Sequence, residues 1–354
     1  MSGSVVPLPT LLNFVSSSLK SSGMPGDKAN AIADVLVRTD AMGHDTHGVA
    51  LLPRYLDEIS EGRMTCEGEA RVVSDHGAAL VLDGRRLPGC WLMGVAVAQA
   101  LERAERLGTA TVCLGNSHHF GGLVVHLLAI AERQMAGVVF TSSPGIATVA
   151  PFGGASPVLS PAPTGAALPT GKDPILIDVS ASISTNNAAF ALKRQGQRFD
   201  TDCLIAPDGM PSNDPAVLTL GGALLPAGGI DHGQKGFGWG LMGEILSQGL
   251  AGHGRTDDAT GMVNAATIQI WNPQAFAGTE YFLRSTGAIA ELCRAATPAD
   301  PSRPLRLPGE AALAHLRKAR ERGLELSADM VAALEKVATR CGAVLPWDVG
   351  DRTQ

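Results

Sequence analysis

The chain is poor in charge and in aromatic side chains. Charged residues make up 18% of its 354 residues, aromatic residues 4%, and the formal net charge is −6. No run of lysine or arginine occurs, so the basic face that a nucleic-acid binder needs for phosphates is missing. No run of about 20 apolar residues could span a bilayer, and the first residues do not resemble a signal peptide. We therefore expect a cytoplasmic protein with neither a nucleic-acid nor a membrane partner.

Cysteine is sparse as well. The six cysteines lie far apart and form no CxxC pair, so the sequence indicates neither a disulfide framework nor a zinc ribbon. We expect buried, reduced thiols. Apolar residues, by contrast, make up 45% of the chain, with 42 glycines and 22 prolines. Wholesale disorder is therefore excluded, and the chain is long enough for one large or two modest domains with many turns.

Helices are predicted at both ends of the chain, with strands and helices mixed between them. Apolar periodicity and glycine stops predict helices over residues 28–42 (with Asp27 as N-cap), 51–59, 91–106, 123–135 (ending before Gly137), 241–249, 310–322 and 328–340. Extended segments are expected over residues 79–82, 109–114, 138–141, 174–179, 215–218 and 266–271. The glycine-rich residues 221–240 are expected to form a loop.

This order of elements predicts an α/β (mixed α+β) protein. We expect residues 1–70 to form an N-terminal helical part and residues 71–305 to form the mixed-sheet body. Residues 306–354 supply the C-terminal helices, which should pack against the N-terminal part.

Two histidine motifs are candidates for chemistry, and the first follows the helix predicted over residues 28–42. It reads His44-Asp45-Thr46-His47-Gly48. Imidazole and carboxylate groups bind metals, but a third ligand at helical spacing and an HExxH motif are absent. A histidine pKa of about 6.5 also suits general acid–base catalysis, which makes His47 a candidate. A histidine that only caps a turn is the third interpretation.

The second motif, His118-His119, lies in residues 115–122, between a predicted strand and a predicted helix. Loops at this position often carry ligand-binding groups. The pair could bind a metal, act as acid and base, or be ordinary polar loop residues. Asp178 and the serines that follow it end a buried apolar strand. Polar groups in such a place need hydrogen-bond partners, so they indicate either a site or a polar network.

A third motif, residues 228–240, combines many glycines with Lys235. Glycines let backbone N–H groups approach a phosphate, and a lysine adds a full charge. Gly238, Gly240 and Gly243 match the spacing of GxGxxG, but no strand precedes them. We therefore interpret this match as chance. Glycines needed only for tight packing are the alternative for the whole motif.

Six segments in order resemble the malate/L-lactate dehydrogenase family of the non-Rossmann type. This family also contains ureidoglycolate dehydrogenase, sulfolactate dehydrogenase, diketogulonate reductase and the cyclic-ketimine reductases. The segments are Arg38-Thr39-Asp40 with His47-Gly48, Leu52-Pro53 and Tyr55; Asn116-Ser117-His118-His119-Phe120-Gly121; Pro151-Phe152-Gly153-Gly154; Ile177-Asp178-Val179-Ser180-Ala181-Ser182; Gly233-Gln234-Lys235-Gly236-Phe237-Gly238; and Leu307-Pro308-Gly309-Glu310. They span most of the chain.

The resemblance implies a non-Rossmann dinucleotide-binding domain with a mixed, largely antiparallel sheet. It also implies a site in a cleft that a homodimer completes, with NAD or NADP as the cofactor. The family's proton donor falls on His47, and a second histidine with acid–base work in some members falls on His119. Cofactor contacts fall on Asp178, Val179, Ser180, Ala181 and Ser182, on Lys235 and Gly236, and on Pro308, Gly309 and Glu310. Asp178 could instead orient a histidine.

The chain departs from the family pattern where the substrate binds. Leu51 stands where members often place an arginine for the substrate carboxylate, and Ser160-Pro161-Ala162-Pro163 replaces Gly-Thr-Asn-Pro. On one continuous helix, residues 47, 51 and 54 would share a face. Arg54 is therefore the expected substitute, and Thr46 is a second candidate for substrate contact.

The sequence as a whole predicts an NAD(P)-dependent oxidoreductase that interconverts a 2-hydroxy acid and a 2-oxo acid, or a related imine. A histidine would supply the proton. A metal-dependent hydrolase or lyase that uses His44, His47, His118 and His119 is the alternative. A dinucleotide-binding protein that has lost catalysis is a third candidate.

Overall fold

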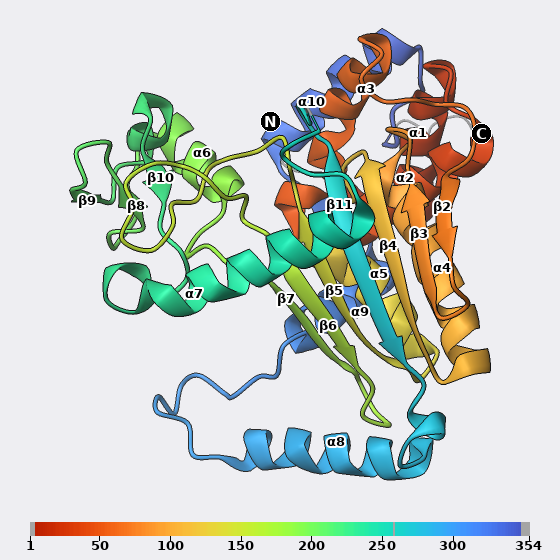
Figure 1. Ribbon diagram of the computed structural model, residues 1–354. Coiled ribbons are helices and arrows are strands. Elements are labelled where there is room, and N and C mark those ends of the chain that lie inside the picture. Colours follow the sequence, from red (N-terminus) through yellow and green to blue (C-terminus); the bar gives the residue numbers. More distant parts are fainter. Residues whose placement is uncertain (1–3, 258, 348–354) are drawn as a thin grey trace.

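A seven-stranded sheet forms the centre of the computed structural model, which describes residues 4–257 and 259–347 (Figure 1). Its strands are, in spatial order, β2 (Arg71–Asp75), β3 (Ala79–Asp83), β4 (Thr109–Ser117), β11 (Asn264–Trp271), β5 (Ala136–Ser142), β6 (Thr164–Leu168) and β7 (Ile175–Val179). All neighbours pair antiparallel except β3 and β4, which are parallel. The expected mixed, mostly antiparallel sheet is therefore confirmed.

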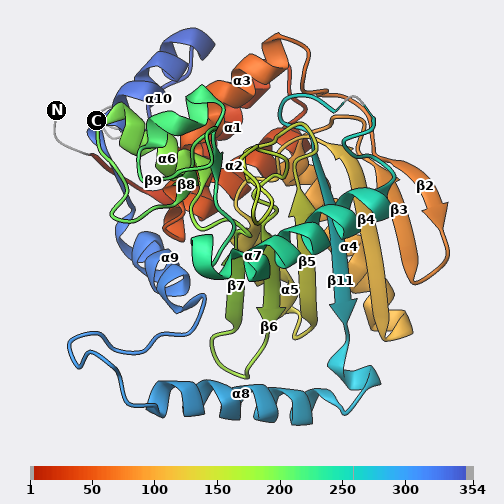
Figure 2. The ribbon, with the colours of Figure 1, turned by 60° about the vertical axis from the view of Figure 1, so that its left-hand side comes forward.

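Helices cover the two faces of the sheet unequally. Helices α4 (Gly89–Leu107) and α5 (Leu123–Glu132) pack along one face. On the other face, α7 (Gly229–Glu244) crosses the strands diagonally and continues as a π-helical turn, η4 (Ile245–Gly249) (Figures 1 and 2).

The two chain ends meet at one end of the sheet. Helix α1 (Leu8–Ser21) contacts α2 (Gly26–Ala41) and α10 (Ala328–Cys341). Helix α10 also contacts α3 (Leu52–Ser60), and α2 contacts α9 (Glu310–Arg322). Near the termini, β1 (Ser4–Val6) pairs antiparallel with β12 (Leu324–Leu326). One hydrophobic core runs from these helices into the sheet; the division at residues 70 and 305 stays a prediction.

Two further parts lie outside this core. A small lobe holds α6 (Asn186–Arg194), the 3-10 helix η3 (Pro215–Leu220) and the short strands β8 (Leu204–Ile205), β9 (Pro211–Ser212) and β10 (Ala223–Leu224), around a small apolar cluster of its own. After the 3-10 turn η5 (Pro273–Ala275), α8 (Thr279–Ala295) runs past the far ends of the strands, away from the terminal helices (Figures 1 and 2). Apolar periodicity did not predict α6 or α8. Across the described residues, no helix is long and apolar enough to cross a membrane.

Three of the predicted boundaries are wrong. Asp27 does not cap α2, because Pro25 takes the N-cap position and Asp27 lies in the first helical turn, where the helix dipole favours an acidic side chain. Gly137 does not end a helix: α5 stops at Glu132, and Gly137 lies in β5 against Ile130. Residues 215–218 are not extended, because the Asp214 side chain accepts a hydrogen bond from the Ala216 N–H and starts η3.

The glycine-rich segment is the largest correction. Residues 221–240 are not a loop that leads into a helix at residue 241. Residues 229–240 already belong to α7. A Cβ on Gly236 would lie 2.4 Å from backbone atoms of Ala227, and one on Gly240 would lie 3.2 Å from Ala181. The glycines therefore let the helix pack closely on its neighbours, which was the alternative interpretation.

The cysteines are free, as expected, but they are not all buried. Cys90, Cys113 and Cys203 are buried, Cys66 and Cys341 are half-buried, and Cys293 is exposed on α8.

Candidate active site

The structure stacks His47 on His119, which belong to two different sequence motifs. Their ring centroids lie 5.7 Å apart and the ring planes differ by 21°. His47 ends a 3-10 turn, η1 (Asp45–His47), after α2, and His119 lies between β4 and α5. Both side chains are half-buried. Two imidazoles that face one another at a partly open position can both reach one small substrate.

Tyr55, on α3, fixes the protonation of the His119 ring. The Tyr55 hydroxyl lies 2.8 Å from Nδ1 of His119, and the Gly121 N–H donates to the same Nδ1 at 3.2 Å. Because an N–H can only donate, Nδ1 must be an acceptor, and the neutral ring then carries its proton on Nε2. Tyr55 is buried, and burial raises the pKa of its hydroxyl well above 10. The hydroxyl therefore stays protonated and donates to Nδ1.

Both stacked histidines are held neutral near pH 7. Burial, reinforced by the neighbouring His44, lowers the pKa of His47 below 6.5. Burial lowers the pKa of His119 well below 6.5, and the charges of His47, His118 and Arg54 act in the same direction. A neutral His47 can accept a proton, while His119 presents an N–H donor at Nε2.

His118 is turned into the core and does not share the site. Its Nε2 lies 3.3 Å from Oε2 of buried Glu58, and Arg63 donates to Oε1 of Glu58 at 3.1 Å. Burial lowers the pKa of His118 to about 4, so the neutral ring donates to the carboxylate. Although burial alone would raise it, the pKa of Glu58 is lowered by the hydrogen bonds from Arg63 and His118. The adjacent histidines therefore have different surroundings and different roles.

Asp178 is hydrogen-bonded to the backbone at the start of α5. Its Oδ2 accepts a hydrogen bond from the Val124 N–H at 3.2 Å, at the start of α5. Burial raises the pKa of Asp178, while the charge of nearby His44 and the Val124 N–H act against that rise. The carboxyl lies close enough to His44 to feel its charge, and its role toward a histidine stays a prediction.

The strand end after Asp178 forms a polar network. Exposed Val179 ends β7. The Ser180 hydroxyl lies 2.6 Å from that of Ser182, and the Ala181 N–H donates to the carbonyl of Pro161 at 2.8 Å. The two serine hydroxyls and the Ala181 N–H are therefore already hydrogen-bonded within the chain.

Two buried oxygens lack a partner beside this strand end. Among the described residues, Thr164 Oγ1 and Asn186 Oδ1 have no hydrogen-bond partner. Thr164 pairs with Val179 in the sheet, and Asn186 begins α6 shortly after Ser182. Buried oxygens without partners fit a polar ligand that this strand end would bind.

Lys235 and Gly236 do not form the expected phosphate loop. Both lie within α7, and the Gly236 N–H donates to the carbonyl of Ala227. That N–H is therefore not free for a phosphate. Lys235 is exposed, so its charge remains available.

Pro308, Gly309 and Glu310 lie against the edge strand β7. The carbonyl of Pro308 accepts from the Leu176 N–H, and a Cβ on Gly309, whose φ is +91°, would lie 2.8 Å from the side chain of Leu176. Glu310 accepts from the Leu307 N–H at 2.9 Å and pairs with Arg294. The Leu307 N–H is the main group that lowers the pKa of Glu310. The Pro308 carbonyl and the Glu310 carboxylate are therefore already hydrogen-bonded within the chain.

Arg54 lies beside the histidines, but not for the expected reason. Residues 47, 51 and 54 do not share one helix, since two 3-10 turns, η1 and η2 (Val49–Leu51), precede α3. Arg54 is exposed, and its charge nevertheless lowers the pKa values of His118 and His119.

Thr46 touches His47 directly. Its Oγ1 lies 2.9 Å from Nδ1 of His47, and its carbonyl accepts from the Asn187 side chain of the small lobe at 3.1 Å.

The geometry gives no support to a metal site. No group of three or more His, Cys, Asp or Glu side chains in residues 4–257 and 259–347 could hold a metal ion.

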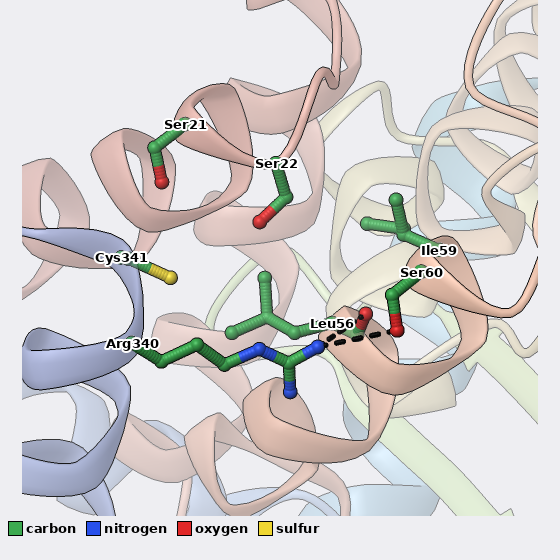
Figure 3. A pocket seen from close by; sticks show the side chains of 7 residues that line it. All are labelled: Ser21, Ser22, Leu56, Ile59, Ser60, Arg340 and Cys341. Atoms are coloured by element: carbon green, nitrogen blue, oxygen red, sulfur yellow. Dashed lines mark hydrogen bonds between the residues drawn. The ribbon is translucent and has the colours of Figure 1, made fainter.

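A cavity of about 270 Å³ lies away from the histidines, between α1, α3 and α10. Figure 3 shows that Arg340 crosses it, donating to Ser60 and to the carbonyl of Leu56.

Comparison with known proteins decides the family. The family model described as malate/L-lactate dehydrogenase matches residues 6–335. The chain belongs to the malate/L-lactate dehydrogenase family. It is 32% identical over 343 residues to hydroxycarboxylate dehydrogenase B of Escherichia coli O157:H7, covering 94% of this chain and 93% of that protein.

Further relatives agree with this family assignment. L-sulfolactate dehydrogenase of Methanocaldococcus jannaschii is 27% identical over 92% of this chain and 93% of its own length. The structure of malate dehydrogenase from Pyrococcus horikoshii OT3 superposes with a TM-score of 0.86 at 26% identity, covering 97% of each chain. This member of the malate/L-lactate dehydrogenase family is therefore a dehydrogenase that acts on CH–OH groups of 2-hydroxy acids, and the metal-dependent hydrolase is set aside.

Proposed function

We propose that this dehydrogenase interconverts a 2-hydroxy acid and a 2-oxo acid with NAD or NADP, using His47 as the general acid and base. The observation that carries the proposal is the stacked pair of His47 and His119, with the tautomer of His119 set by Tyr55. When bound, the nicotinamide supplies or takes up the hydride, and the protein provides orientation and charge.

The two histidines divide the work on the reacting oxygen. In the oxidative direction, neutral His47 accepts the hydroxyl proton of the substrate; in reduction, protonated His47 returns it. His119 is held neutral by burial and donates a hydrogen bond from Nε2 to the same oxygen. A neutral donor stabilises developing negative charge without giving up its own proton.

Three groups support binding of the cofactor. The strand end at Asp178, Val179, Ser180, Ala181 and Ser182 has buried oxygens without partners beside it. Exposed Lys235 on α7 offers a charge to the phosphates, as a point charge rather than as part of a loop. Pro308, Gly309 and Glu310 lie along the other side of β7 and are the third candidate.

The substrate carboxylate is assigned to Arg54. A carboxylate that leaves water needs a cation or several donors, because an unpaired buried charge costs several kcal/mol. Half-buried Leu51 cannot provide one, whereas the charge of Arg54 reaches the histidines. Thr46, in contact with His47, offers a hydroxyl to the same substrate.

We also propose that the protein is a homodimer. Helix α8 turns large apolar side chains outward: Leu292 is 73% exposed, and Tyr281 and Ile289 are exposed as well. Ile289 follows Tyr281 by eight residues and Leu292 follows Ile289 by three, so the three side chains form one stripe on the helix. Exposed apolar stripes of this kind mark protein contacts, and a second copy would cover the stripe with its own.

Turnover of 2-oxo acids tests the proposal directly. A panel of short and long 2-oxo acids and a cyclic imine is offered with NADH and with NADPH, and loss of the reduced nicotinamide is followed by absorbance. We expect turnover with at least one 2-oxo acid of the panel. Binding of the cofactor without turnover of any panel member would instead indicate that catalysis has been lost.

A further inference from the structure

Asp40 is a buried carboxyl that the proposed chemistry does not use. It lies near the end of α2 and is 8% exposed. Its Oδ2 accepts a hydrogen bond from the Val49 N–H at 2.8 Å. Its Oδ1 has no hydrogen-bond partner among the described residues. A buried acceptor without a partner is costly, so this carboxyl needs an explanation beyond ordinary packing.

The carboxyl of Asp40 lies directly beneath Gly48. A Cβ built on Gly48 would lie 1.9 Å from Oδ1 of Asp40, a distance that no side chain can adopt. Gly48 links η1, which ends in His47, to η2, which begins at Val49. The carboxyl of Asp40 therefore contacts the two residues that directly follow His47.

The double turn is held by the packing of Val49 in the hydrophobic core, by the hydrogen bond from Asn187 to the Thr46 carbonyl, and by the Asp40 carboxyl. Within it, the His47 N–H donates to the carbonyl of His44, and the Leu51 N–H donates to that of Gly48, each at 3.0 Å. Single 3-10 turns have poor hydrogen-bond geometry and are weak alone. The side-chain tie from Asp40 to Val49, which spans nine residues, connects the turn to the long helix α2.

Burial also changes the protonation of the Asp40 carboxyl. It raises the pKa of Asp40 to about 7, and the charge of nearby Asp45 acts in the same direction, against the Val49 N–H. Asp40 therefore spends much of its time as a neutral acid. An uncharged group of the same shape, such as asparagine, can replace it without losing the acceptor.

We propose that Asp40 is a positioning residue for His47: through Val49 and Gly48 it holds the His47 ring in its stacked position against His119. This inference rests on the proposed role of His47. Displacement of a catalytic group by about 1 Å lowers turnover by about a hundredfold, whereas none of the residues proposed to bind the dinucleotide belongs to the His47 turn. Loss of Asp40 should therefore lower kcat and leave cofactor affinity unchanged.

Four variants test this positioning role. Asp40→Ala removes the tie, and Asp40→Asn keeps the acceptor. Gly48→Ala keeps the Asp40 side chain but places a Cβ against its carboxyl, so that the contact between them must change. Asp34→Ala removes a half-exposed aspartate from the same helix and is the matched control. Each variant is measured for kcat, KM, cofactor affinity by fluorescence titration, and the imidazole C–H signals of His47 by NMR, assigned by their loss in His47→Asn.

We expect Asp40→Ala and Gly48→Ala to lower kcat about tenfold to a hundredfold, to change cofactor affinity less than about twofold, and to shift the His47 signals. Asp40→Asn and Asp34→Ala should stay within about threefold of the wild type in kcat. Wild-type kcat and His47 signals in both disruptive variants would overturn the inference, as would an equal loss in Asp40→Asn. If Asp40→Ala does not fold, Gly48→Ala and Asp40→Asn still decide.

The NMR signals separate this inference from the proposed function. If His47→Asn keeps full turnover, the proposed role of His47 is wrong. In that case, shifted His47 signals in Asp40→Ala would still show that Asp40 positions the ring, and unshifted signals would refute it.

Discussion

Individual side chains decide the chemistry of this site through their surroundings. His118 and His119 are neighbours in sequence, yet one donates to a buried glutamate and the other accepts from a buried tyrosine. The local sequence left this pair open between metal binding, acid–base chemistry and an ordinary polar loop, and only the family resemblance singled out His119. The local sequence could not separate the two rings, because their partners Glu58 and Tyr55 lie on α3, far away in the chain. Tyr55 was visible only as part of the family motif, and no local pattern indicated its contact with His119.

The low pKa of His47 predicts the pH dependence of the reaction. For oxidation of the 2-hydroxy acid, His47 must be neutral to accept a proton, and burial lowers its pKa below 6.5. The value of kcat/KM for oxidation should therefore rise through a pKa below 6.5 and be flat at pH 7 and above, while reduction should fall over the same range. The pH–rate profile of the free enzyme measures this. A limb centred above pH 7 would contradict the assignment.

Arg54 is predicted to bind the substrate carboxylate. Arg54→Lys should raise KM for the best 2-oxo acid by about tenfold, since an ammonium group cannot reproduce the two-pronged contact of a guanidinium. Arg133→Lys is the control, because Arg133 is an exposed arginine that pairs with Glu105. Steady-state kinetics measures both variants. A wild-type KM for Arg54→Lys would show that Arg54 is an ordinary surface residue.

At the scale of elements, the sequence predicts those helices and strands that local signals define. The helix expected over residues 310–322 occurs as α9, since its periodicity is regular and Gly323 ends it. Helix α7 was not predicted, because glycine disfavours helices. Its glycines are explained by the close packing of the helix against Ala181 and Ala227. That packing depends on partners far away in the chain, which one sequence does not reveal.

Glu244, a buried carboxylate at the end of α7, ties the helix to the loop that departs from the family pattern. Glu244 accepts from the backbone N–H and hydroxyl of Ser160, at 2.7 Å and 2.6 Å, and from Arg255 at 2.7 Å. Arg255→Ala would leave the buried Glu244 carboxylate without its cation and should lower the free energy of unfolding by about 3 kcal/mol.

Lys318→Ala is the matched control for this ion pair. It removes an exposed pair with Glu325 and should change the free energy of unfolding by less than about 0.5 kcal/mol. Urea unfolding measures both variants. Equal stabilities of the two would mean that Arg255 does not stabilise the buried Glu244 carboxylate.

At the scale of the whole molecule, α8 is the part that the isolated chain explains least. Only Ala290 is buried among its residues, and Figures 1 and 2 show the helix lying past the ends of the strands. The sequence suggested a homodimer only through the family resemblance. The exposed apolar stripe on α8 indicates where the two copies of the proposed dimer would contact each other.

Leu292→Asp should therefore weaken the dimer. A charge within the stripe would be buried without a partner on association. Leu220→Asp is the control, since Leu220 is 72% exposed on the small lobe. Light scattering of the eluted protein should show a wild-type dimer, a monomeric Leu292→Asp and a dimeric Leu220→Asp. A monomeric wild type at micromolar concentration would contradict the proposal, and so would a dimeric Leu292→Asp.

The central claim is that His47 moves the proton during hydride transfer, and replacement of this one side chain tests it most directly. The measurement is single-turnover oxidation of bound reduced cofactor by the best 2-oxo acid, in the wild type, His47→Asn and His119→Asn. We predict that His47→Asn slows this step by about 10²–10⁴ while cofactor affinity stays nearly unchanged. His119→Asn, which removes only a neutral donor, should slow it less. An unchanged rate in His47→Asn would contradict the account, and the full loss in His119→Asn alone would assign the proton to the other ring.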